Sequence, residues 1–177
     1  MSYKSTPTKF GKTAVLIHWG TAVLILSMFV LGALANNTID PQMKAMLLRG
    51  HVVLGMITLL LTIYRIVWWT FFDKKPKDLE TISNLQKKAS HLVHFLLYAC
   101  IIIMSVSGIG IIALSGAGDI LFGNSTANLP DFHQYLPRAP HGIVSKVFAA
   151  ILFLHIGAAL HHHFILKDGL MKRMKLK

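Results

Sequence analysis

Residues 13–39 read TAVLIHWGTAVLILSMFVLGALANNTI and contain no Asp, Glu, Lys or Arg. Three further stretches are similarly apolar, namely 50–72, which only Arg65 interrupts, 89–118 and 147–166. Each reaches the roughly 20 residues that a helix rising ~1.5 Å per residue needs to cross ~30 Å of hydrocarbon. The sequence therefore predicts an all-α integral membrane four-helix bundle, with spans at roughly 13–35, 50–72, 90–114 and 143–166.

Composition agrees with a protein that is surrounded by lipid. The 177 residues are 54% hydrophobic and 14% charged, whereas about a quarter of the residues of a soluble domain are charged. The formal net charge of +11 raises the question of nucleic acid, but the basic residues lie between the apolar stretches, as loop charges do. We therefore expect no nucleic-acid partner. The single cysteine, Cys100, lies within an apolar stretch, which excludes a disulfide framework.

The basic residues also predict the orientation. The side of the N-terminal segment, the loop after the second span and the C-terminal tail has 14 Lys and Arg, counting Arg65 in the second span, and the other side has 4. Because cytoplasmic loops are enriched in these residues, both termini are predicted to be cytoplasmic. The longest excursion, 115–140, is interrupted by Gly and Pro and has room for a short surface helix only. Residues 1–177 are therefore expected to form a single transmembrane domain.

Histidines at membrane depth are the strongest functional signal. Ionisable side chains are costly in hydrocarbon and usually face a bundle interior. His141 and His155 are 14 residues apart, so they share one face of the fourth span and lie ~21 Å apart along it. His51 matches the depth of His141 on the outer side, and His18 matches that of His155 on the inner side. Two such pairs are what two haems with paired histidine ligands require, because facing helices supply axial imidazoles to haem iron.

Spacing alone leaves alternatives open. His94 lies at about the depth of His18 and is a rival inner ligand. A lone intramembrane histidine more often bonds a neighbouring helix, and a set of histidines also fits a proton relay or a metal-ion path. The glycines that could let a macrocycle lie flat on a helix would equally suit close helix packing; they are Gly32, Gly55, Gly108, Gly110 and Gly157.

Several short motifs resemble the bacterial cytochrome b561 family of four-helix dihaem membrane proteins. They are Ile17-His18-Trp19, GHVVLG at 50–55, HLVHFLLY at 91–98, Pro140-His141-Gly142, Leu154-His155 and HHHF at 161–164. The resemblance extends from about Lys9 to Met174. It implies a multi-pass protein of the bacterial inner membrane with two haem b groups, His18 and His155 ligating the cytoplasmic one and His51 and His141 the periplasmic one. It also moves His91 and His94 away from iron, towards haem propionates or quinone.

The resemblance further implies an oxidoreductase. Iron with two axial histidines has no open position, which favours electron transfer over dioxygen binding. Similar family members oxidise superoxide and reduce ubiquinone, so superoxide or another small donor is the expected substrate. Arg49, Arg138 and Lys146 neighbour the outer ligands and are expected to steer this anion, although neutralising propionates or snorkelling would explain them equally well.

A ubiquinone site is predicted at the cytoplasmic end, formed by His91, His94 and His162. His161, His162 and His163 form a triplet where the resemblance has a pair, so the member that faces a ligand stays open. The main alternative is a haem-bearing membrane anchor that relays electrons from a docked dehydrogenase or hydrogenase, a redox protein partner. A histidine-lined metal transporter is a third hypothesis.

Overall fold

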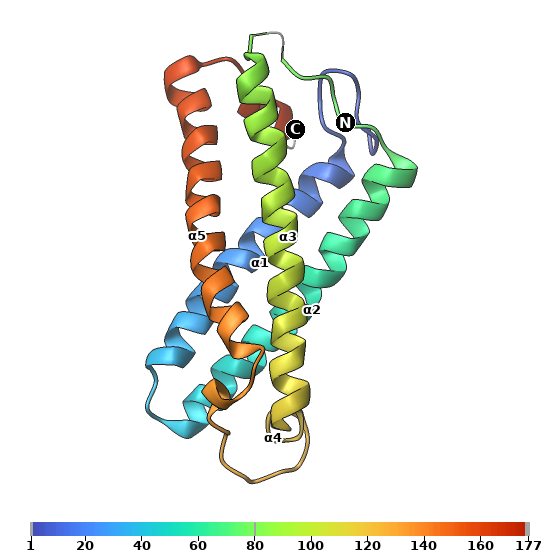
Figure 1. The fold of residues 1–177 in the computed structure, drawn as a ribbon. Helices are drawn as coiled ribbons and strands as arrows, with labels where there is room; N and C mark the ends of the chain where they lie inside the picture. The colour runs from blue at the N-terminus through green and yellow to red at the C-terminus, as the bar shows by residue number, and fades with distance from the viewer. Residues whose placement is uncertain (1, 80, 176–177) are drawn as a thin grey trace.

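The computed structural model describes residues 2–79 and 81–175, and within these ranges every regular element is helical. The bundle consists of α1 (Lys12–Asn37), α2 (Pro41–Val67), α3 (Asn84–Ser115) and α5 (Arg138–His161), while α4 (Ala117–Phe122) is a short helix after α3. Shorter turns of other helix types are η1 (Trp68–Phe72), η2 (Phe132–Gln134), η3 (His162–Leu166) and η4 (Leu170–Met174). α1 begins and α5 ends at the same end of the bundle (Figure 1).

Four continuous helical segments are long and apolar enough to cross a membrane: Lys12–Asn37, Pro41–Phe72, Asn84–Ser115 and Arg138–Leu166. This confirms the predicted four-helix membrane architecture. Large apolar side chains cover the outside of the bundle; Leu60 is 61% exposed and Phe153 75% exposed. Water would disfavour such a surface, whereas lipid accommodates it, and the helices satisfy their own backbone groups.

The four long helices form two pairs. α1 packs along α2, and α3 packs along α5; in Figure 1 the α3–α5 pair lies in front of the α1–α2 pair. Between the pairs, Ile25, Cys100, Ile101 and Phe148 form a buried apolar core. Phe148 lies seven residues from both His141 and His155. The core therefore occupies the middle of the bundle, and the histidines lie towards its two ends.

Three of the helices, α2, α3 and α5, begin before their apolar stretches do. Asp40 accepts a hydrogen bond from the backbone N of Gln42 at 3.0 Å, and Pro41 occupies the first helical position, so α2 begins nine residues before position 50. His51 thus lies inside α2 rather than at its start. A capping box of Ser83 and Gln86 likewise begins α3 upstream of its apolar stretch.

The end of the bundle where α1 begins is closed by three segments that bind one another. The Asp73 carboxylate accepts hydrogen bonds from the backbone N of Ser5 at 3.0 Å and from its hydroxyl at 2.8 Å. Arg173 donates to the backbone carbonyls of Thr8 and Lys77. Burial raises the pKa of Asp73, but hydrogen bonds from Ser5 and its other neighbours outweigh this, and the net pKa is below the ordinary value.

Candidate functional site

At the end of the bundle opposite the termini, α2 and α5 bring two imidazoles together. The ring centres of His51 and His141 are 6.3 Å apart, and the ring planes meet at 64°. An imidazole nitrogen lies about 2 Å from a metal that it ligates, so two rings on opposite sides of one metal have their centres about 6–6.5 Å apart. The spacing of this outer pair therefore fits a single metal ion between the rings.

Hydrogen bonds fix the protonation of both outer imidazoles. His51 Nδ1 lies 3.1 Å from the carbonyl O of Met28, and a carbonyl only accepts, so Nδ1 carries the proton. His141 Nδ1 lies 3.0 Å from Ser107 Oγ. That hydroxyl lies 2.7 Å from the carbonyl of Ile103, to which it donates, so its oxygen accepts from His141. In the neutral ring Nε2 is then unprotonated, which is the form that binds metal, and the Nδ1 bonds hold the rings in place.

Two of the predicted small residues contact these rings. A Cβ added to Gly32 would lie 3.3 Å from Cε1 of His51, and one added to Gly108 would lie 3.4 Å from Cε1 of His141. The absence of a side chain at both positions lets each imidazole lie against a neighbouring helix. The other three differ: Gly55 faces Met28, Gly110 faces Pro137, and a Cβ on Gly157 would meet nothing within 4 Å.

At the end nearer the termini, three imidazoles approach one another from α1, α3 and α5. The ring centres of His18 and His155 are 6.3 Å apart at an interplanar angle of 67°, which repeats the outer spacing. His94 is closer to His155, with ring centres 5.1 Å apart. This distance is shorter than the roughly 6 Å that two imidazoles on opposite sides of one metal need. Distance therefore favours His18 over His94 as the partner of His155.

Arg65 of α2 adds a partly buried positive charge to this inner cluster. Its Nη2 donates to His18 Nδ1 over 3.3 Å, and its guanidinium lies 5.6 Å from the Tyr98 ring centre. Its Nε is buried and has no hydrogen-bond partner. Within residues 2–79 and 81–175, no carboxylate pairs with Arg65. An anion beside the buried, unpartnered Nε would stabilise the guanidinium, and a haem propionate has the chemistry to supply it.

Sequence reasoning missed the role of Arg65, which it counted as an interruption of the second span and as one of the basic residues on the side of the termini. The available signal was its position, because a charge inside an otherwise apolar span is a functional candidate by default. The Arg65–His18 bond also distinguishes the inner site from the outer one. An arginine only donates, so His18 Nδ1 accepts here, whereas His51 Nδ1 donates.

The three residues predicted to form a quinone site make different contacts. His91 is exposed on α3. His94 Nδ1 lies 2.7 Å from the Ser90 carbonyl, which leaves its Nε2 unprotonated. His162 Nδ1 is bound to the Asp168 carboxylate. No hydrogen bond or ring contact in the described part of the chain links His162 to His91 or His94.

Asp168 is the negative partner of His162. Its second carboxylate oxygen accepts a hydrogen bond from the backbone N of Leu170 at 3.0 Å. Burial raises the pKa of Asp168, but the hydrogen bonds from His162 and Leu170 outweigh this, and the net pKa is below the ordinary value. The carboxylate thus stays ionised beside His162.

The three basic residues predicted near the outer ligands lie along α2 and α5. Arg49 and Lys146 are exposed, two and five residues from His51 and His141 respectively. The Arg138 guanidinium folds back along α5, and its Nη1 lies 2.9 Å from where a Cβ on Gly142 would be. Arg138 therefore lies over the residue that follows His141.

Comparison with known proteins shows the family of this chain. The chain is 28% identical to cytochrome b561 homolog 2 of Escherichia coli (strain K12), with 98% of this chain and 95% of the relative covered. It is 27% identical to the probable superoxide oxidase CybB of Yersinia pestis, with 96% of this chain and 97% of that relative covered. It is 24% identical to cytochrome b562 of Cereibacter sphaeroides, with 93% of this chain and 94% of that relative covered. The family model for prokaryotic cytochrome b561 matches residues 9–177, and the chain belongs to that family.

Proposed function

We propose that this multi-pass membrane cytochrome holds two haem b groups, oxidises superoxide at the periplasmic face of the bacterial inner membrane and reduces ubiquinone near the cytoplasmic face. One observation carries the proposal: two imidazole pairs, at two levels of the bundle, share the same ring-centre distance of 6.3 Å. Their members on α5 are 14 residues apart, or ~21 Å along the helix. Haem at each level would supply one-electron redox chemistry.

The outer group would be ligated by His51 and His141. Both rings keep Nε2 free for a metal, and both are held through Nδ1. Gly32 and Gly108 give the rings space against the neighbouring helices. The protein's contribution at this level is thus to orient two neutral imidazoles in advance.

The inner group would be ligated by His18 and His155, with Arg65 holding one of its propionates. Its buried, unpartnered Nε supports this role for Arg65, because a carboxylate would give the guanidinium both a charge partner and an acceptor. His18 would then turn Nδ1 away from Arg65. His94, whose ring lies beside His155, would adjoin the inner group without ligating it.

The termini are assigned to the cytoplasm because 14 of the 18 Lys and Arg belong to segments on their side of the bundle. The outer pair is then periplasmic. Arg138, Lys146 and Arg49 would attract the superoxide anion to it. Of the three acidic residues on this side, Asp40 and Asp131 already accept backbone hydrogen bonds from Gln42 and His133. The relative named as a probable superoxide oxidase supports this choice of donor.

Electrons and protons balance over two turnovers. Two superoxide anions each lose one electron and leave as dioxygen, and one ubiquinone gains these two electrons and two protons to become ubiquinol. His91, His94 and His162 are proposed to serve the quinone, taking protons from the cytoplasmic water. The His162–Asp168 pair supports this, because the carboxylate orients the imidazole through its Nδ1 beyond the end of α5.

The test is an absorbance measurement on purified protein, with enzymatically generated superoxide as the sole donor. The haem bands should become reduced, and added ubiquinone should reoxidise them with formation of ubiquinol. Superoxide dismutase, added as a control, should abolish the reduction. A protein that stays oxidised under a superoxide flux would contradict the proposed donor and would favour the relay from a docked redox protein.

A further inference from the structure

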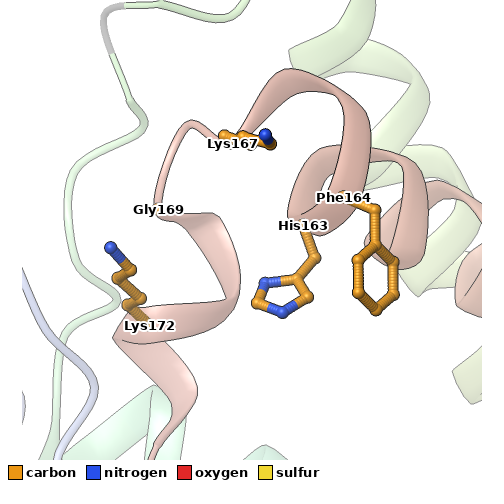
Figure 2. A pocket seen from close by; sticks show the side chains of 5 residues that line it. All are labelled: His163, Phe164, Lys167, Gly169 and Lys172. Atoms are coloured by element: carbon orange, nitrogen blue, oxygen red, sulfur yellow. The ribbon is translucent and has the colours of Figure 1, made fainter.

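A cavity of about 220 Å³ lies beyond the end of α5, where the chain turns from η3 into η4. Its walls are His163 and Phe164 from η3, Lys167 and Gly169 from the turn, and Lys172 from η4. Figure 2 shows the His163 imidazole between the two lysine-bearing segments, with the Phe164 ring to one side. The ligand assignments made above involve none of these five residues.

The backbone around the cavity is tightly specified. Lys167 and Gly169 both adopt left-handed conformations, with φ of 51° and 81°, so that η4 folds back towards η3. A side chain at position 169 would be strained in this conformation. η4 is fixed to the rest of the protein, because Trp19 donates to the carbonyl of Met174 and Arg173 donates to two other segments. The Lys172 wall is therefore held in place.

The polar residues that line the cavity are two lysines and one histidine. The nearest carboxylate in sequence, Asp168, is already engaged by His162 and by the backbone N of Leu170. No ion pair among the described residues includes Lys167 or Lys172. Two lysines thus border the cavity without an ion-pair partner among the described residues, and such a border attracts an anion.

The cavity also lies at the boundary between lipid and water. The membrane-spanning segment that begins at Arg138 ends at Leu166, and the cavity residues flank that point. Phe164 is 63% exposed and is followed by exposed Ile165. An occupant would meet cationic groups on one side and an apolar surface on the other. The volume is below the roughly 300 Å³ at which pockets for drug-sized ligands begin, so it suits a small headgroup.

We propose that this cavity binds the phosphate of an anionic phospholipid, with phosphatidylglycerol as the representative headgroup, in the leaflet on the side of the termini. Lys167, Lys172 and His163 contact the phosphate, and Phe164 contacts the start of an acyl chain. Basic pockets at the ends of membrane helices bind phosphate headgroups through the same chemistry. The inference is independent of the haem assignment.

Native mass spectrometry of the full-length protein tests this inference. The protein is released from nanodiscs that contain phosphatidylcholine with a minor fraction of phosphatidylglycerol, and the retained phosphatidylglycerol is counted. Wild type should retain one more such lipid than Lys167→Gln/Lys172→Gln, and each single variant should weaken retention about fivefold. Lys175→Gln, which removes the same charge from the same tail but does not line the cavity, should behave as wild type, and so should Lys172→Arg.

Two outcomes would overturn the proposal. Equal loss of lipid in Lys175→Gln and in the double variant would mean that general tail charge, rather than the cavity, holds the lipid. A second experiment tests soluble phosphate as the ligand. The protein in pure phosphatidylcholine nanodiscs is titrated with inorganic phosphate, and binding is followed by ³¹P NMR. Saturable phosphate binding there, together with no preference for phosphatidylglycerol, would make the ligand a soluble phosphate. An unchanged haem spectrum verifies that each variant is folded.

Discussion

Nη2 of Arg65 lies 3.3 Å from Nδ1 of His18, which places a partly buried cation against one member of the inner imidazole pair. The same guanidinium keeps Nε without a partner. Replacement of Arg65 by Leu should lower the midpoint potential of the inner haem, because loss of a nearby positive charge favours the ferric state. We expect a shift on the order of 30–60 mV, where ~59 mV is a tenfold change for a one-electron couple.

Potentiometric titration of the haem bands measures this shift. Lys88→Gln, which removes a charge from the exposed start of α3 on the same side, serves as the control and should leave both potentials unchanged. An unshifted inner potential in Arg65→Leu would contradict the proposed contact between Arg65 and the inner group.

The outer ligand pair depends on the small size of Gly32. A Cβ there would lie 3.3 Å from Cε1 of His51, and the larger side chain of Gly32→Val would displace the ring. Haem content should fall towards one per chain. Gly20→Val is the matched control in the same helix, because a Cβ at Gly20 meets nothing within 4 Å. If the two variants kept the same haem content, the ring would not need this space.

The contact between the N-terminal segment and the loop after α2 should depend on pH through Asp73. Because its pKa is depressed in the folded protein, the stabilisation is present above the unfolded value of about 3.9 and is lost as pH falls through the folded pKa. Asp73→Asn should lower the unfolding temperature by a few degrees at pH 7, and the difference should shrink at pH 3.

Thermal unfolding in detergent at the two pH values checks this prediction. Asp78→Asn is the control, because Asp78 lies in the same loop and bonds neither Ser5 nor Trp68 in the residues that the structure describes. This variant should change the unfolding temperature little at either pH. A destabilisation by Asp73→Asn that is equally large at pH 3 would show that the carboxylate charge is not responsible.

Superoxide oxidation should depend on local positive charge at the outer end. Arg138 folds over Gly142, beside His141, so Arg138→Gln should lower the second-order rate of haem reduction by superoxide. Rising ionic strength should lower the wild-type rate too, because the Debye length is only ~10 Å at 0.1 M salt. Lys44→Gln is the control, because it removes the same charge in the first turn of α2, seven residues before His51. It should lower the rate less than Arg138→Gln does. Rates that are insensitive to both salt and Arg138→Gln would exclude steering.

Much of the fold could be predicted because each membrane-spanning helix corresponds to a long uncharged stretch of the sequence. Long uncharged stretches fixed the number of helices and their approximate centres. The starts of α2 and α3 could not be placed from hydropathy, since Asp40 and Ser83 begin these helices with polar turns ahead of the apolar residues. A helix cap is a local hydrogen bond of a polar residue, and a hydropathy profile does not reveal it.

The candidate site was predictable in part for the same reason. Helical periodicity places His141 and His155 on one face of α5, and depth suggested partners that the ring spacings support. The closer approach of His94 to His155 depends on how α3 and α5 pack, which spacing within one helix does not encode. Nor could spacing pair His162 with Asp168, because the bend from η3 into the following turn brings them together.

The central claim is that two haems are held by His51 with His141 and by His18 with His155. Its most direct test is haem content per chain, measured by pyridine haemochrome assay on His141→Ala and His155→Ala. We predict two haems in wild type and one in each variant. Two haems remaining in His155→Ala would contradict the pairing and would show that His94 takes part in ligating the inner iron.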